Sequence, residues 1–292
     1  MSGASKPPQP PRREHGLALV IVLWTLTLLA VIATEFAYST RIEAKLARNV
    51  VDTATTRQLA QAGVARGLYG ILHPDPAVRW RADGTTYQFP MHRAVIQVTV
   101  RDETAFIDLN AAQAGLLDGL FRVAGVKEPP RQSLVDAILD WRDKDSLRRL
   151  NGAEDDDYTR AGFKYRAKDA RFDAVAELML VAGMSPALYR KVEPWLTIHS
   201  GRAGINRDTA PREVLLAMPG ADPGEVEATI AARSNSEAAG AQRTTARQTG
   251  AFRITARASL PSGVAKTLTV VVRVGVQRVK APRVSVLDWR ER

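Results

Sequence analysis

The chain of 292 residues contains no cysteine. This absence excludes thiol chemistry and disulfides, so the folded part must rest on its core, on bound metal or on neighbouring subunits. The sequence also lacks the HExxH, GxSxG, Walker and GxGxxG patterns of common enzyme and nucleotide sites. Its four histidines are scattered: His15, His73, His92 and His199. The sequence therefore does not predict an enzyme.

A long uncharged stretch lies near the N-terminus. From Leu17 to Thr34 every residue is apolar or a threonine, and at a helical rise of roughly 1.5 Å per residue it covers about 27 Å, close to the hydrocarbon thickness of a bilayer. Lys6, Arg12 and Arg13 precede it, which predicts a cytoplasmic leader and an extracytoplasmic remainder. We expect one membrane span at about residues 17–39.

A secretory signal peptide is the alternative, because it also begins with basic and then apolar residues. The apolar run is longer than a typical signal, however, and no small-x-small cleavage site closes it. Charged residues follow without Pro or Gly, and helix-compatible sequence continues until Pro74 and Pro76 end it. The pattern predicts one helix over 17–73, half in lipid and half in water.

The formal net charge of +10 is unevenly distributed. Residues 251–292 hold nine Arg and Lys against two acids, whereas residues 140–157 hold seven acids against four bases. A strongly basic balance suggests nucleic acid or an anionic surface as partner. Because the excess is concentrated near the end of the chain, we interpret it as a solvated or subunit-facing surface, and nucleic acid is not the expected partner.

Alternating residues predict strands at two places far apart in the chain. In AVIQVTVRD (94–102) apolar residues alternate with polar ones, after a predicted turn at Asp83-Gly84. The same alternation flanks Pro261-Ser262-Gly263, which predicts a hairpin. Between these regions the pattern is helical, and residues 234–250 read as a flexible return loop. The simplest architecture is one antiparallel sheet on the outer half of the long helix, with a helical domain inserted between its strands.

The helical region contains an internal echo. IDLNAAQAGLLDGL from Ile107 matches INRDTAPREVLLAM from Ile205, and we expect Asn110 in the first copy and Asp208 with Thr209 in the second to cap a helix. Both copies look like small SAM-like or helix-hairpin-helix units. A membrane-anchored helix-hairpin-helix DNA-binding protein is therefore the alternative function, although Asp222 after the Gly220 turn would repel a phosphate.

The densest group of acids predicts a cation site. The acids are Asp143, Asp145, Glu154, Asp155, Asp156 and Asp157. Carboxylates presented by an irregular loop suit Ca²⁺, a hard cation with flexible geometry, although the spacing is not that of an EF-hand. A solvated acidic loop paired with Arg148 and Arg149 is an equal alternative. Calcium is the one cofactor that the sequence predicts.

The N-terminal segment resembles the class III signal of type IV pilins and pseudopilins. A Gly stands directly before the apolar run, basic residues precede it, and the helix continues past the membrane. The resemblance implies that a prepilin peptidase cuts between Gly16 and Leu17, and that Leu17 is then N-methylated. Most members carry a Glu four residues beyond the new N-terminus, where this chain has Ile21. The minor pseudopilin K family of type II secretion systems characteristically lacks that Glu.

Further segments resemble the same family along nearly the whole chain from Arg12. They are the Asp-Trp-x-Asp of residues 140–143, NGAEDDDY (151–158), the run from Phe172 to Ser200, INRDTAP (205–211) and SVLDWRE near the end. The resemblance implies a protein of the bacterial inner membrane with a single span and a periplasmic C-terminal part. It also implies a place at the pseudopilus tip with the minor pseudopilins I and J, and calcium in the inserted domain.

Together these observations predict an α+β fold. It has a long N-terminal transmembrane helix, a pilin-like antiparallel sheet and a large inserted all-α domain of SAM-like or helix-hairpin-helix-like type. The expected boundaries are a leader at 1–16, the helix at 17–73, a pilin-like α/β domain at 74–107 and 250–292, and the inserted helical domain at 108–249.

Overall fold

The computed structural model describes residues 15–238, 250–275 and 283–291. Most of the predicted leader (1–16) and most of the predicted return loop (234–250) lie outside these residues. The chain forms two compact units, residues 1–55 and 56–292. The first described element, α1 (His15–Ile71), contributes to both units and is continuous, as its lack of Pro allows.

Within the first unit, α1 exposes its apolar side chains along its length. Threonine hydroxyls in this part bond back to the carbonyl of the preceding turn; Thr25 and Thr34, for example, donate to Val22 and Ala30. Their polar groups are thereby satisfied within the helix, as an apolar surrounding requires. Among the described residues, α1 is the one helix long and apolar enough to cross a membrane.

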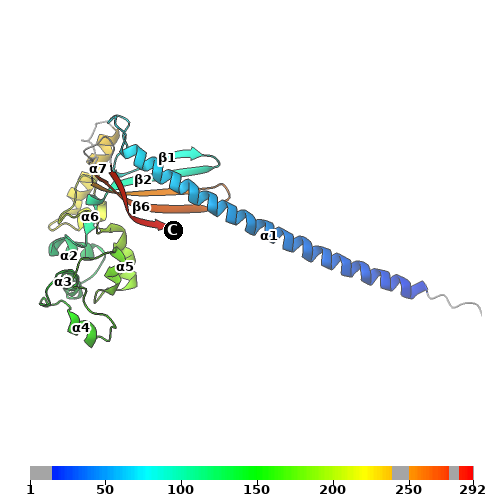
Figure 1. Cartoon of the computed structure of the whole chain (residues 1–292), viewed down its shortest axis with the longest axis horizontal. Helices are drawn as coiled ribbons and strands as arrows, with labels where there is room; N and C mark the ends of the chain where they lie inside the picture. The colour runs from blue at the N-terminus through cyan, green and yellow to red at the C-terminus, as the bar shows by residue number, and fades with distance from the viewer. Residues whose placement is uncertain (1–14, 239–249, 276–282, 292) are drawn as a thin grey trace, which may run out of the picture. The chain divides into compact units, whose positions relative to one another are not determined.

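Five antiparallel strands form the main sheet of the second unit (Figure 1). They are β1 (Asp83–Met91), β2 (Ala94–Asp102), β5 (Gly250–Ser259), β6 (Ala265–Gly275) and β7 (Arg283–Glu291), in the order β1-β2-β5-β6-β7. The predicted hairpin at Pro261-Ser262-Gly263 is confirmed, because β5 and β6 pair on either side of it. The predicted turn at Asp83-Gly84 is wrong. These residues begin β1, and a register shift follows them before Thr86.

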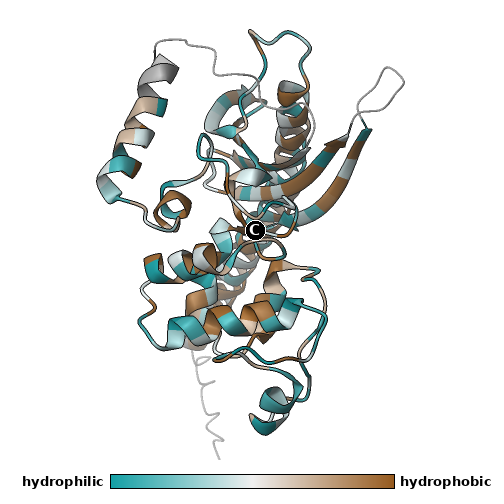
Figure 2. Cartoon of the chain, turned by 90° about the vertical axis from the view of Figure 1, so that its left-hand side faces the viewer, coloured by the Kyte–Doolittle hydropathy of each residue, from teal (hydrophilic) through white to brown (hydrophobic). Residues whose placement is uncertain are grey.

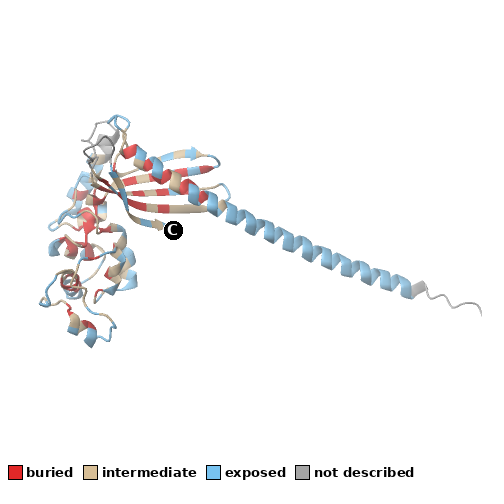
Figure 3. Ribbon diagram, in the orientation of Figure 1, coloured by how far each residue is buried: buried red, intermediate tan, exposed pale blue. Residues whose placement is uncertain are grey.

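The last turns of α1 cover one face of this sheet. Ile96, Val98 and Val100 of β2 are fully buried there, as their alternation predicts. Gly63 and Gly67 let the helix approach closely, because a Cβ at Gly67 would lie 2.9 Å from Ile254 Cγ2. Figure 3 shows buried residues repeating along the strands and along this part of α1. The sheet and helix therefore enclose one aliphatic core.

The remaining elements belong to the insertion between β2 and β5. They are η1 (Glu103–Ala105), β3 (Ile107–Asp108), α2 (Ala114–Val123), α3 (Pro130–Arg142), α4 (Asp155–Arg160), η2 (Val175–Leu180), α5 (Pro186–Val192), η3 (Glu193–Trp195), β4 (Leu196–Thr197), α6 (Arg212–Leu216) and α7 (Pro223–Ala238). The insertion is helical apart from the short parallel pair β3–β4. Its helices carry both hydrophobic and hydrophilic residues (Figure 2) and enclose a second core.

The internal echo corresponds to two packed helices, α2 and α6. Equivalent positions are buried in both copies: Ala112 with Ala210, and Leu117 with Leu215. The expected caps are wrong, since neither helix has a side-chain cap. Asn110 instead bonds the backbone of Phe172 twice, at 2.7 and 2.9 Å. The Asn110 side chain, which the local pattern assigned to a helix end, thus bonds a distant loop instead.

The boundary between sheet and insertion is held by polar contacts. Glu103, fully buried, receives two hydrogen bonds from Arg253 of β5, at 2.8 and 3.2 Å. Arg253 also donates to the carbonyl of Leu196 at 3.0 Å. One arginine therefore connects a central strand to η1 and to β4 of the insertion.

Candidate functional site

Asp140 and Asp143, at the end of α3, share one arginine. The Asp140 carboxylate is fully buried and accepts from Arg149 Nη1 at 2.7 Å and from the Arg149 backbone N–H. Asp143 Oδ2 also accepts from Arg149 Nη1. A Cβ at Gly152 would lie 1.9 Å from Asp140 Oδ2. Glycine at this position therefore lets the following loop close over the buried carboxylate.

The second group of acids does not form the irregular loop that the sequence suggests. Residues 155–160 form α4, and three aspartates occupy its first turn. Negative charge at a helix N-terminus is favourable, because the first N–H groups point outward there. Asp157 Oδ2 accepts from the Glu154 backbone N–H at 3.1 Å. The acidic block therefore helps to start a helix.

Several carboxylate oxygens around α4 are buried without a hydrogen-bond partner in the described part of the chain. They are Asp143 Oδ1, both oxygens of Glu154, Asp155 Oδ1 and Asp169 Oδ1. Burial, together with the charges of Asp140, Asp169, Asp143 and Asp155, raises the pKa of Glu154 to about 7. These groups are therefore close enough to repel one another. Burying such a cluster of carboxylates lowers the stability of the fold unless a proton or a cation is bound.

The other predicted ligands have different surroundings. Asp145 Oδ1 accepts from the Leu147 backbone N–H at 3.0 Å, and Asp156 is exposed. Asp157 pairs with Arg160 at 3.0 Å and Arg148 at 3.4 Å. The structure thus brings Asp143, Glu154 and Asp155 into one neighbourhood. No three carboxylates or imidazoles of the described residues are already gathered in metal-ligand positions.

Sequence reasoning missed Asp169 as a candidate ligand. It lies in a basic segment between Lys168 and Arg171, nine residues after the end of α4 at Arg160. Its backbone has φ 50°, a left-handed conformation that is uncommon for residues other than glycine. Burial and the charges of Asp155, Asp143 and Asp145 raise the pKa of Asp169. The left-handed backbone, visible only in the structure, is the signal that marks this residue.

The helix-hairpin-helix turn does not offer a phosphate site. Gly220 has φ 70°, as such a turn requires. Asp222, just before α7, however, accepts from the Glu225 backbone N–H at 3.0 Å. An N–H of the first turn is thus already bonded to a carboxylate, which would also repel a phosphate. The alternative of DNA binding at this turn is not supported.

Comparison with known proteins finds a family model and relatives that share one description. A family model described as type II secretion system protein K matches residues 98–201. Type II secretion system protein K of Klebsiella pneumoniae is 28% identical over 63% of this chain and 62% of its own length. The protein of that name from Aeromonas hydrophila is 28% identical over 68% of both chains. This chain is thus similar to type II secretion system protein K over about two thirds of its length.

Another relative of the same name matches less of the chain. The Pseudomonas aeruginosa protein is 37% identical over 39% of this chain and 34% of its own length. This chain therefore spans less than two thirds of the length of the K. pneumoniae and P. aeruginosa relatives.

A solved structure has the same fold. It is a chain of the GspK-GspI-GspJ complex from the type 2 secretion system of enterotoxigenic Escherichia coli. The likeness covers 86% of this chain and 98% of that chain, with a TM-score of 0.52 and 18% identity. The predicted α+β architecture of a long helix, an antiparallel sheet and inserted helices is thereby confirmed.

The predicted processing residues lie at the start of α1. Gly16 and Leu17 are in its first turn, directly before the apolar stretch of the first unit. The family and this one apolar helix support anchoring in a membrane.

Proposed function

We propose that this chain is a minor pseudopilin of a type II secretion system, a structural subunit and not an enzyme. The observation that carries the proposal is the combination of one apolar N-terminal helix with a sheet packed on the end of that same helix. Such a subunit can be stored in a membrane and later packed into a fibre by its helix. The relatives named protein K support this role.

The proposed place is the tip of a periplasmic pseudopilus, beside the minor pseudopilins I and J. Two features support this position. Ile21 stands where most pilin-like subunits carry a Glu. A bulky insertion lies in the sequence between β2 and β5, which are neighbouring strands of the sheet. The insertion would hinder a further subunit from stacking above. The solved complex of related fold contains GspK, GspI and GspJ.

Affinity purification from crosslinked membranes tests the partners. We expect the tagged chain to recover two further minor pseudopilins, and immunogold microscopy to find it at fibre ends in low copy number. Ile21→Glu should leave both results unchanged if the insertion determines the position. Labelling along the whole shaft would contradict the tip position, and recovery of DNA without pseudopilins would revive the DNA-binding alternative.

The proposed maturation is cleavage between Gly16 and Leu17 by a prepilin peptidase, followed by N-methylation. The mature chain would cross the inner membrane once, with its C-terminal part in the periplasm. Gly16→Val should leave a full-length precursor, because a side chain would block close approach of the peptidase. Gly3→Val is the matched control and should be processed normally. A mature N-terminus beyond residue 34 would indicate an ordinary secreted protein instead.

We also propose that Ca²⁺ binds the acidic cluster of the insertion. Asp143, Glu154 and Asp155, joined by Asp169, supply buried oxygens without partners among the described residues. Oxygen donors of this kind suit Ca²⁺. The bound ion would offset the mutual repulsion of the carboxylates. Asp145 and Asp157 remain candidates for completing its shell, whereas exposed Asp156 does not.

Thermal melting of the full-length chain in detergent, with calcium or with chelator, tests this proposal. An ion that binds only the folded form stabilises by about 2.7 kcal/mol at a hundred times its Kd. The double variant Asp143→Asn with Glu154→Gln should lose the calcium response, whereas exposed Asp156→Asn should keep it. An unchanged melting temperature in wild type would show that the cluster is only an acidic surface.

A further inference from the structure

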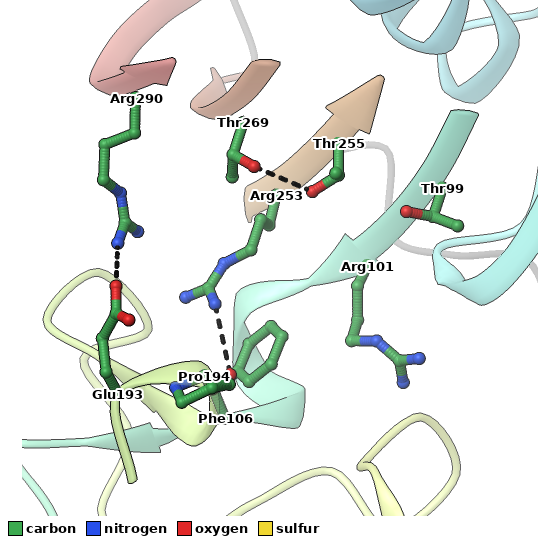
Figure 4. A pocket seen from close by; sticks show the side chains of 9 residues that line it. All are labelled: Thr99, Arg101, Phe106, Glu193, Pro194, Arg253, Thr255, Thr269 and Arg290. Carbon is green, nitrogen blue, oxygen red and sulfur yellow. Dashed lines mark hydrogen bonds and ion pairs between the residues drawn. The ribbon is translucent and has the colours of Figure 1, made fainter. Parts of the chain in front are cut away.

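A pocket of about 240 Å³ lies where the sheet meets the insertion. It is on the sheet face opposite α1, and η3 of the insertion supplies part of its wall. Figure 4 shows three arginine side chains from β2, β5 and β7 pointing toward the insertion, with three threonines on the sheet beside them. No motif in the sequence marks this pocket, because its residues come from three separate parts of the chain: 99–106, 193–194 and 253–290.

The floor of the pocket is a row of hydroxyl groups. Thr99, Thr255 and Thr269 are direct partners across β2, β5 and β6. The hydroxyls of Thr255 and Thr269 lie 3.2 Å apart and form one hydrogen bond, in which either can be the donor. The Thr99 hydroxyl has no hydrogen-bond partner in the part of the chain that the structure describes. The floor can therefore both donate to a ligand and accept from it.

Two of the three arginines in the pocket already have carboxylate partners. Arg253 is paired with buried Glu103 at 2.8 Å. Arg290 is paired with Glu193 of η3 at 2.9 Å and with Asp288 at 2.8 Å. These arginines hold the walls in place, and their charges are matched.

Arg101 differs from the other two. It has no ion pair within the described residues, and its one described hydrogen bond goes to the Thr209 carbonyl at 2.7 Å. Asp83, the acid whose charge acts on Arg101 across the strands, is already paired with Arg81 at 2.7 Å. Burial lowers the pKa of Arg101. A half-buried guanidinium with unused donors, beside a row of hydroxyls, is a typical anion site.

The glycine at position 84 keeps Arg101 in this position. A Cβ on Gly84 would lie 1.8 Å from Arg101 Nη2, and Gly84 has φ 96°. The guanidinium therefore lies directly against the backbone of β1. A side chain at position 84 would displace it from the pocket.

We propose that this pocket binds a carboxylate group on a short carbon chain, with Arg101 as its main cation and the threonine hydroxyls as further donors. Pro194 lines the pocket and offers apolar contact to the carbon chain. Glu193 in the same wall disfavours a second negative charge, so a monocarboxylate fits better than phosphate. The group belongs either to a free short-chain acid or to a Glu side chain of a peptide. The proposal does not depend on the pseudopilin role.

Saturation-transfer NMR on the full-length chain in detergent tests the pocket. The probes are butyrate, the capped peptide acetyl-Gly-Glu-Gly-amide and inorganic phosphate, at constant ionic strength. We expect butyrate or the peptide to bind with a Kd on the order of 1 mM, as a small ligand with one charged contact would. Tighter binding of the peptide would identify an acidic protein segment as the source, and binding of butyrate alone a free acid.

Three variants separate the pocket from general surface charge. Arg101→Gln should weaken binding by about tenfold or more, since a hydrogen bond to a charged group is lost. Thr255→Val, which keeps the shape of the side chain, should weaken it by about threefold. Exposed Arg257→Gln, on the same strand and face but outside the pocket, should leave the Kd within about twofold. Melting curves establish that each variant is folded.

Three results would overturn the proposal. The first is no transfer to butyrate or to the peptide in wild type. The second is equal weakening by Arg257→Gln and Arg101→Gln, which would indicate only surface attraction. The third is binding of phosphate in preference to both carboxylates.

Discussion

The two cores of this chain are built from different side chains. Between α1 and the sheet, almost all of the buried residues are aliphatic. Of the described residues in this core, Phe252 is the one aromatic that is fully buried. The core of the insertion contains Trp141 and Tyr158, and buried acids lie beside it, Asp140 and Glu154 among them.

The difference follows from how each part satisfies its backbone. Strands and a long helix pair nearly all of their own N–H and C=O groups, so an aliphatic filling is sufficient. The insertion has short helices and long connections, whose backbone groups need side-chain partners. Asn110 and Tyr158 supply such partners, to Phe172 and to Ala182. Polar residues in the second core are therefore part of its construction.

Breaking the ion pair that links the two cores should cause the largest loss of unfolding free energy. Glu103→Ala removes the buried partner of Arg253 and leaves an uncompensated charge, which costs about 3–5 kcal/mol. Chemical denaturation measures the loss. The control is Glu227→Ala, which breaks the exposed pair with Arg212 and should cost less than about 1 kcal/mol. Equal losses would show that the buried pair is not a structural link.

Glycine contacts compare the two cores directly. A Cβ at Gly119 of α2 would lie 1.8 Å from the Ala217 carbonyl oxygen, whereas a Cβ at Gly67 would meet only side-chain methyls, at 2.9 Å or more. Backbone cannot move aside as a side chain can. Gly119→Ala should therefore destabilise by about 3 kcal/mol and Gly67→Ala by about 1 kcal/mol.

The control for both glycine variants is Gly204→Ala, because a Cβ there would have nothing within 4 Å. Its change in unfolding free energy should stay within about 0.5 kcal/mol. If Gly67→Ala proves the more costly of the two core variants, the sheet core would be the more rigid one.

The acidic cluster should make the stability of the insertion depend on pH when calcium is removed. Folding raises the pKa of Glu154 from 4.5 to about 7. The folded state therefore binds a proton more tightly, and stability is highest below pH 4.5 and is lost as the pH rises toward 7. In chelator we expect a fall in melting temperature over this range, about 2–4 °C for each 1 kcal/mol lost.

Glu154→Gln should reduce that pH dependence, because amide and carboxyl have similar shapes and only the carboxyl ionises. Saturating calcium should reduce it too, since the ion binds the ionised form. A melting temperature that rises from pH 5 to pH 7 in chelator would contradict this account of Glu154.

Removing a single hydroxyl from the core of the insertion should cause the smallest loss of unfolding free energy. The Tyr158 hydroxyl accepts from the Ala182 backbone N–H at 3.0 Å. Tyr158→Phe should cost about 1 kcal/mol in unfolding free energy, because that N–H stays buried without a partner. Exposed Tyr69→Phe on α1 is the matched control and should be neutral. A neutral Tyr158→Phe would mean that the insertion does not need this polar contact.

The sequence predicted the first core better than the second. Alternation placed Ile96, Val98 and Val100 on the buried face of β2, because a period of two reports directly on which face is covered. Asn110 was misassigned because its partner, Phe172, is 62 residues away. Local patterns contain no information about such contacts.

The candidate cation site shows the same limit. Acids close together in sequence identified Asp143, Glu154 and Asp155, but Asp169 reaches them through tertiary folding and a left-handed backbone. The helical state of residues 155–160 was also missed. A run of acidic residues suggests a loop from its composition, although acidic residues are equally suited to the first turn of a helix.

The ion pair between Glu103 and Arg253 joins residues 150 apart in the chain, and β2 and β5 pair beside it, with Asp102 opposite Phe252. Closing so long a loop from an unfolded chain loses considerable entropy before any contact compensates. An insertion that is already compact brings its two ends together and shortens that loop. We therefore expect the helical core to form first during refolding, with amides of α2 and α3 protected from hydrogen exchange before those of β2 and β5. Simultaneous protection in a pulse-labelling experiment would exclude this order.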